Sequence, residues 1–211
     1  MKQSSWLVLI IIVLVLAGGY VWWHGTQSPM TGTTPVTTAT STQIVAGVDN
    51  ATYTNSALGF TIQYPSTAAA SETDFNGYVQ TTQTPVTSFV LPASMSAGTN
   101  LGTAGVYVGA TSSASIVASC TSASTSTGET AQGTQTIGTQ QFAVFSSSDA
   151  GAGNFYETKS YRTVANGSCL EINETLHSGN IDNYPVGAVT EFNHDEFSGI
   201  LEAIVHTYQA I

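Results

Sequence analysis

The densest group of potential metal ligands in the sequence is His194-Asp195-Glu196. Three consecutive side chains of a helix point about 100° apart, so these three could not hold one ion together. Asn193 and Glu196 instead fit the N-cap and the third position of a helix, and acidic side chains suit the positive end of a helix dipole. The sequence therefore favours a helix start here over a metal centre.

A second group of oxygen ligands surrounds two glycines and consists of Asp149 and Asn154, with Glu157 after them. These three residues are the weak candidates for a calcium loop. The alternating Asp and Asn ligands of an EF-hand are missing, and a turn joining two strands is the simpler interpretation. We therefore predict neither a metal nor a cofactor.

Hydrolysis is the catalytic hypothesis that the residue types allow, because serine is abundant and four histidines are present. No Gly-x-Ser-x-Gly motif supports a nucleophile elbow, so we assign no catalytic residue. The form of this hypothesis that remains is a hydrolase of wall or exopolymer that uses His177 with a carboxylate such as Glu157.

Cys120 and Cys169 are the two cysteines of the chain. An even pair predicts a structural disulfide in an oxidising compartment, and two free buried thiols are the alternative. Closing a loop of about 50 residues would stabilise the domain by roughly 4 kcal/mol. No Cys-x-x-Cys motif points to redox catalysis.

Charge is scarce and one-sided, with 8% of residues charged against about 25% in a typical soluble domain. The part that follows the N-terminal apolar run carries two cations, Lys159 and Arg162, and all 13 carboxylates, a formal net charge of −11. Such a chain repels phosphate and anionic headgroups. We therefore predict no nucleic-acid partner.

The N-terminal run from Trp6 to Trp23 has no charged residue and falls within the roughly 17–25 residues that cross a bilayer. Lys2 precedes it, so the positive-inside rule places the N-terminus in the cytoplasm. A cleaved signal peptide is the rival interpretation, but a long apolar block ending in Trp22 and Trp23 fits an uncleaved anchor better. The membrane is thus an expected partner through this helix.

This anchor sets the expected organisation of the chain. A stretch rich in Thr, Ser and Pro follows it and is typical of a flexible linker. The expected parts are a cytoplasmic N-terminus at 1–5, a transmembrane helix at 6–23, a linker at 24–50 and an extracytoplasmic domain at 51–211.

Period-two alternation and turn residues predict the strands of this domain. Expected strands cover 60–64, 86–91 and 106–108, the last bounded by Gly105 and Gly109. Residues 110–133 are expected to contain a long loop, and a hairpin is expected to turn at Gly138-Thr139.

Asn166-Gly167 between two strand-like runs predicts a two-residue hairpin. Pairing outward from this turn sets Arg162 opposite Glu171 and Lys159 opposite Glu174. We expect both pairs to be ion pairs, worth about 0.2–1 kcal/mol each, and to fix the register of the hairpin.

Residues 193–207 carry apolar side chains at the spacing of a helix that lies on a sheet. The predicted fold class is α+β, an antiparallel β-sheet with flanking helices that include this C-terminal one. The expected core residues are Phe60, Ile62, Val106, Val108, Tyr161, Ile172, Phe197, Leu201 and Ile204.

The opening Leu58-Gly-Phe-Thr-Ile-Gln-Tyr-Pro65 and the closing helix resemble those of membrane-anchored bacterial envelope proteins with a PsbP-like domain. The resemblance implies an antiparallel sheet flanked by helices, and it covers most of residues 53–211. PsbP domains are accessory and binding modules, so no catalytic activity carries over.

The function expected from all of this is a membrane-tethered, non-catalytic binding or accessory domain outside the cytoplasm. Its partner would be an envelope protein or a surface polymer. A passive structural or adhesive surface protein and the hydrolase described above are the alternatives. A deep pocket with converging polar groups would favour an enzyme, and an exposed apolar patch would favour partner binding.

Overall fold

The computed structural model of the protein describes residues 43–73, 83–124 and 126–211. These residues belong to one compact unit, Ser41–Ile211, of the two into which the chain divides. The expected transmembrane helix at 6–23 and most of the expected linker lie outside the described residues. Within the described part, none of the helices is both long and apolar enough to cross a membrane.

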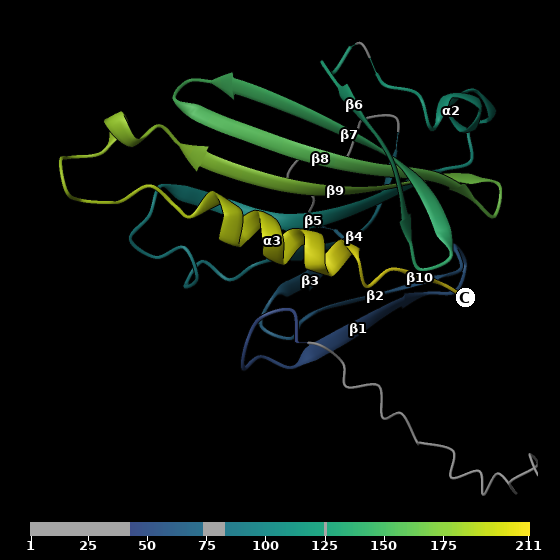
Figure 1. Ribbon diagram of the computed structural model, residues 1–211, viewed down its shortest axis with the longest axis horizontal. Helices are drawn as coiled ribbons and strands as arrows, with labels where there is room; N and C mark the ends of the chain where they lie inside the picture. The colour runs from purple at the N-terminus through teal and green to yellow at the C-terminus, as the bar shows by residue number, and fades with distance from the viewer. Residues whose placement is uncertain (1–42, 74–82, 125) are drawn as a thin grey trace, which may run out of the picture. The chain divides into compact units, whose positions relative to one another are not determined.

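Two antiparallel sheets form the unit (Figure 1). The larger has seven strands in the order β3-β4-β5-β9-β8-β7-β6, and the smaller has the order β1-β2-β10. The bounds are β1 Asn50–Asn55, β2 Phe60–Pro65, β3 Ala69–Ser71, β4 Thr84–Val90, β5 Leu101–Thr111, β6 Thr130–Ile137, β7 Gln140–Gly151, β8 Asn154–Ala165, β9 Ser168–Gly179 and β10 Gln209–Ala210.

The long strands β7, β8 and β9 follow one another through tight turns, as the sequence predicts. Asn166 and Gly167 both have positive φ, 49° and 75°, which is the backbone of a type I′ turn. The predicted register is confirmed, because Ala165 pairs with Ser168 and the pairing continues outward from there. The turn at Gly138-Thr139 is also confirmed, since Ile137 pairs with Gln140.

One expectation about a strand length is wrong. Strand β5 runs through Gly105 and Gly109, which were expected to end it. A Cβ at Gly105 would lie 3.1 Å from the ring of Tyr107 and 3.2 Å from the carbonyl oxygen of Phe89, so this glycine makes room for a ring. In the segment expected to contain a long loop, helix α2, Ala114–Ser119, comes first. Turns follow it in the described residues up to the start of β6 at Thr130, where the loop was expected.

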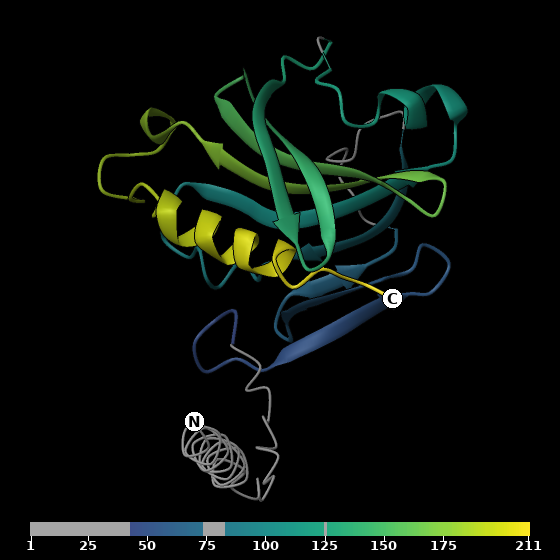
Figure 2. The same cartoon turned by 45° about the vertical axis from the view of Figure 1, so that its right-hand side comes forward.

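Helix α3, His194–Val205, lies along one face of the large sheet (Figures 1 and 2). The Asn193 side chain accepts a hydrogen bond from the Glu196 N–H at 3.3 Å, which confirms the predicted cap. The buried side chains of this helix are those of the predicted stripe, and all nine expected core residues are buried. A short 3₁₀ turn, η1 at Ile181–Asn183, precedes the helix. An antiparallel sheet with few helices is therefore the observed architecture.

Strand alternation gives the hairpin of β8 and β9 two different faces. Ile172, Glu174 and Leu176 lie on the face that α3 covers, which we name the groove face. Cys169 and Glu171 lie on the opposite face, which we name the disulfide face because Cys169 bonds there to Cys120, the residue that ends α2.

Candidate functional site

Two hollows lie side by side next to α3 on the groove face. The first, of about 760 Å³, lies between α3 and strands β6 to β8, and the second, of about 790 Å³, lies toward the segment that joins β9 to α3. Ser148, Glu157 and His194 line both hollows, so the two adjoin at these residues. Each volume is within the range of about 300–1,000 Å³ that ligand pockets occupy.

The junction of the two hollows is built from one strand residue and the first turn of α3. Nε2 of His194 lies 3.0 Å from Oε2 of Glu157, and Nδ1 of His194 lies 3.4 Å from Oγ of Ser198. The side chains of Glu157 and His194 are about half exposed. A ligand that crosses the junction would therefore contact both.

The first hollow contains a chain of polar contacts over an apolar floor of Val144, Leu176 and Leu201. Nζ of Lys159 lies 2.9 Å from Oε1 of Glu202 and 5.2 Å from the centre of the Tyr161 ring. Oη of Tyr161 donates a hydrogen bond to Oε1 of Glu174 at 2.8 Å. Strand β8 thus presents a cation and a phenol to carboxylates from β9 and α3.

Glu174 is 6% exposed. Burial raises the pKa of its carboxyl group to about 7, against the lowering effects of the Tyr161 hydrogen bond and the Lys159 charge. Burial also raises the pKa of the Tyr161 phenol, and the nearby charge of Glu174 raises it further. The hollow therefore holds a carboxyl group that changes charge near neutral pH.

The expected ion pairs across the hairpin do not form, although the residues face each other as predicted. Among the described residues, Lys159 bridges to Glu202 and Arg162 bridges to Glu129. Each cation still lowers the pKa of the glutamate it faces. The long basic side chains reach past the neighbouring strand to a carboxylate from another segment, which sequence pairing could not anticipate.

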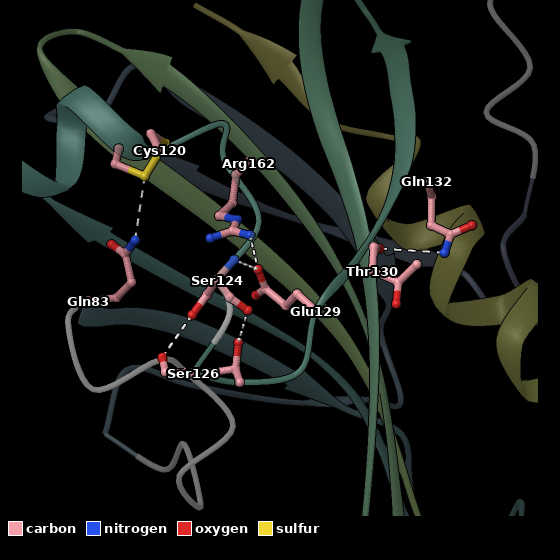
Figure 3. A network of polar contacts seen from close by, with 10 residues as sticks. Gln83, Cys120, Ser124, Ser126, Glu129, Thr130, Gln132 and Arg162 are labelled. Atoms are coloured by element: carbon pink, nitrogen blue, oxygen red, sulfur yellow. Dashed lines mark hydrogen bonds and ion pairs between the residues drawn. A yellow bond between two sulfur atoms is a disulfide. The ribbon is translucent and has the colours of Figure 1, made fainter.

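The bridge between Arg162 and Glu129 lies on the disulfide face (Figure 3). The same Glu129 oxygen accepts a hydrogen bond from the Ser124 N–H at 2.7 Å. The Arg162 guanidinium also lies over the Phe145 ring, 4.1 Å from its centre. Both members of the bridge are almost fully buried, with side chains 6% and 2% exposed.

The predicted disulfide between Cys120 and Cys169 is confirmed, with Cα atoms 5.5 Å apart. Beside it, Nε2 of Gln83 lies 3.5 Å from Sγ of Cys169. Glu171 is fully buried nearby, and burial raises the pKa of its carboxyl group to about 7. Among the described residues, neither oxygen of this carboxylate accepts a well-formed hydrogen bond. The side chains of Asn173 and Gln83 nevertheless lie close enough to lower its pKa.

The weak metal candidates do not converge. Oδ1 of Asp149 accepts a hydrogen bond from the Ala150 N–H at 2.8 Å, and Oδ1 of Asn154 lies 2.9 Å from Nε2 of His177. Glu157 is paired with His194 instead. In the described ranges, no group of three or more His, Cys, Asp or Glu residues could hold a metal ion. The segment is the turn between β7 and β8.

The suggested pairing of His177 with Glu157 is wrong. His177 lies opposite Tyr156 and Glu157 lies opposite Leu176, so the two side chains leave the sheet on opposite faces. The His177 ring stacks on the Tyr156 ring with centres 4.4 Å apart, and burial lowers its pKa. The histidine that does meet Glu157 is His194, which comes from a helix 37 residues away in sequence. No local pattern in the sequence indicates that contact.

Comparisons with known proteins add little to this geometry. No family model and no curated protein matches the sequence. A crystal structure of a protein from Bacteroides thetaiotaomicron is similar at a TM-score of 0.43 and 14% identity, covering 76% of this chain and 48% of that one. The chain thus spans about half the length of that protein. The resemblance to PsbP-like domains stays a prediction.

Proposed function

We propose that the protein is a membrane-tethered, non-catalytic binding domain that holds a hydroxyl-rich surface polymer outside the cytoplasm. The observation that carries this proposal is that the two hollows adjoin beside α3 and share Ser148, Glu157 and His194. A single small molecule needs one pocket, whereas two adjoining hollows suit an extended chain. The polymer would lie beside α3 and cross the junction.

The side chains along the groove are of the kinds that bind polyols. Gln132, Gln135 and Ser146 supply amide and hydroxyl groups in the first hollow. Phe155, which is 42% exposed, and Phe192 supply aromatic surface in the second. Hydroxyls and amides bond to sugar hydroxyl groups, and rings cover the apolar faces of a sugar.

The location outside the membrane rests on the disulfide and on the N-terminal sequence. A buried disulfide fits an oxidising, extracytoplasmic compartment. The apolar run at 6–23 would anchor the chain, and the linker would hold the domain at high effective concentration near the surface.

A hydrolase is the second candidate, and one observation favours it. Ser198, His194 and Glu157 form a chain of contacts at the junction, which replaces the His177 arrangement. Ser198 and His194 are also neighbours at i and i+4 of one helix, a spacing at which side chains meet without any catalytic role. We therefore retain binding as the proposal.

A polymer-binding screen tests the proposal. The full chain, in a detergent without a sugar headgroup, would be titrated with neutral and charged soluble polysaccharides. Ser148→Trp should abolish binding, because the indole would fill the junction that both hollows share. Ser66→Trp, at an exposed turn outside the groove, is the matched control and should bind normally.

Binding that survives Ser148→Trp would place the polymer elsewhere, and binding of none of the polysaccharides would remove the proposal. Turnover of a polysaccharide that is abolished by His194→Ala would replace binding by hydrolysis.

A further inference from the structure

We infer that the polymer bound in this groove carries repeated positively charged amino groups, as a de-acetylated amino-sugar chain does. This inference rests on the proposed function and specifies the chemistry of its ligand. It is argued from the charges that line the groove, from the state of one buried carboxylate and from the positions of the others.

The charge of the groove is strongly negative. Lys159 is the one lysine or arginine among the residues that line the two hollows, and it is already bonded to a carboxylate of α3. The carboxylates that line the two hollows are Asp149, Glu157, Glu174, Glu191 and Glu202. A bound polymer displaces water from these groups, and desolvated carboxylates need a compensating charge. An anionic polymer would be repelled, and a neutral one would leave this charge uncompensated.

Glu174 places a second kind of acceptor in the groove, a carboxylate held by the sheet. It is more than nine-tenths buried and lines the first hollow. Tyr161 donates to its Oε1, and among the described residues no hydrogen bond to its Oε2 is formed. An ammonium group has three donors and could bond to this oxygen from the hollow. Burial raises the pKa of this carboxyl group, and a bound cation would favour its charged form.

The carboxylates are spread along the groove. Glu174 and Glu202 line the first hollow, Asp149 and Glu191 line the second, and Glu157 lies at the junction. A single amine would neutralise one hollow only. A chain with an amine on successive sugars would place a positive charge in each hollow, and its C–H faces would cover Val144, Leu176 and Leu201 in the first.

Two oligomers that differ only in their amino groups provide the test. The full chain in the same detergent would be titrated calorimetrically with glucosamine oligomers and with the same oligomers fully N-acetylated, at mildly acidic pH. The glucosamine series should bind at least about tenfold more tightly, and added salt should remove most of that difference.

Variants then locate the charge effect. Glu157→Gln and Glu191→Gln should each weaken binding of the glucosamine oligomers several-fold more than binding of the N-acetylated oligomers. Asp49→Asn removes an equal charge from an exposed position outside both hollows and should change neither.

Equal affinity for the two series would overturn the inference about charge and leave the groove as a polymer site. A second outcome would also overturn only the inference about charge. In that outcome neither oligomer series binds, but another polysaccharide does and Ser148→Trp abolishes its binding. Binding of no polysaccharide at all would overturn the proposed function with it.

Discussion

The two faces of the β8–β9 hairpin carry the same set of charged groups in different surroundings. On the groove face, Lys159 lies opposite Glu174 and bridges to Glu202. On the disulfide face, Arg162 lies opposite Glu171 and bridges to Glu129. On both faces the cation bridges to a second carboxylate, and burial raises the pKa of the glutamate opposite it to about 7.

The two bridges differ in how far their side chains are exposed to solvent. The side chains of the Lys159 bridge are 36% and 39% exposed, whereas those of the Arg162 bridge are 6% and 2% exposed. An exposed pair contributes about 0–1 kcal/mol, but removing one partner of a buried pair costs about 3–5 kcal/mol. We conclude that the bridge on the disulfide face contributes more stability, whereas the bridge on the groove face remains open to solvent.

The largest expected effect comes from replacing the buried cation. Arg162→Met should lower the free energy of unfolding by about 3–5 kcal/mol, because Glu129 and Glu171 would remain buried without a cation. Lys159→Met is the matched change on the groove face and should cost less than about 1 kcal/mol. Urea denaturation of both variants measures the difference. Equal losses would remove the distinction between the faces.

The disulfide is the next largest contribution on that face. Replacing Cys120 and Cys169 together by Ser should lower the free energy of unfolding by about 2–4 kcal/mol, because the unfolded chain regains the freedom of the closed loop. Thermal denaturation with and without reductant gives the measurement. The variant should keep its polymer binding at temperatures where it stays folded, since the groove lies on the other face. Loss of binding in the folded variant would show that the faces are coupled.

The buried glutamates predict a dependence of stability on pH. Their pKa values rise from 4.5 in the unfolded chain to about 7 in the folded one, so the folded state holds more protons between these values. The contribution of these two groups to the free energy of unfolding is therefore full below about pH 4.5. It is lost as the pH rises through about 7. Glu171→Gln and Glu174→Gln should each remove on the order of 1–3 kcal/mol of this fall.

Unfolding measured at several pH values tests this, with Asp49→Asn as the control for net charge. A stability that rises with pH between about 5 and 8 would show that these carboxyl groups are ionised and well paired in the folded protein.

The smallest expected effect belongs to the phenol of the groove face. Tyr161→Phe removes the donor to Glu174 and should cost roughly 1–2 kcal/mol at neutral pH. It should also raise the pKa of Glu174 further, because the lost hydrogen bond favoured the charged form. Carbon-detected NMR titration of the Glu174 carboxyl group measures that shift. An unchanged pKa would mean that the charge of Lys159, and not the Tyr161 hydrogen bond, stabilises the charged form of this carboxyl group.

Features that depend on neighbours along the chain could be predicted from the sequence. Asn166-Gly167 permits the positive φ values of a two-residue turn, and this turn fixes the register of β8 and β9. Asn193 and the apolar spacing after it fixed the start and the buried face of α3. Two cysteines allow only one intramolecular pairing. Each of these features follows from local backbone geometry, periodicity or counting.

Which side chains contact one another depends on tertiary packing. The contact of His194 with Glu157 and the adjoining hollows depend on how α3 lies against the sheet. The bridges to Glu202 and Glu129 depend on where α3 and the segment after α2 lie. Alternation places a side chain on one face of a strand but does not say what covers that face. Long basic side chains reach any carboxylate within several ångströms, so their partners are set by packing between distant segments.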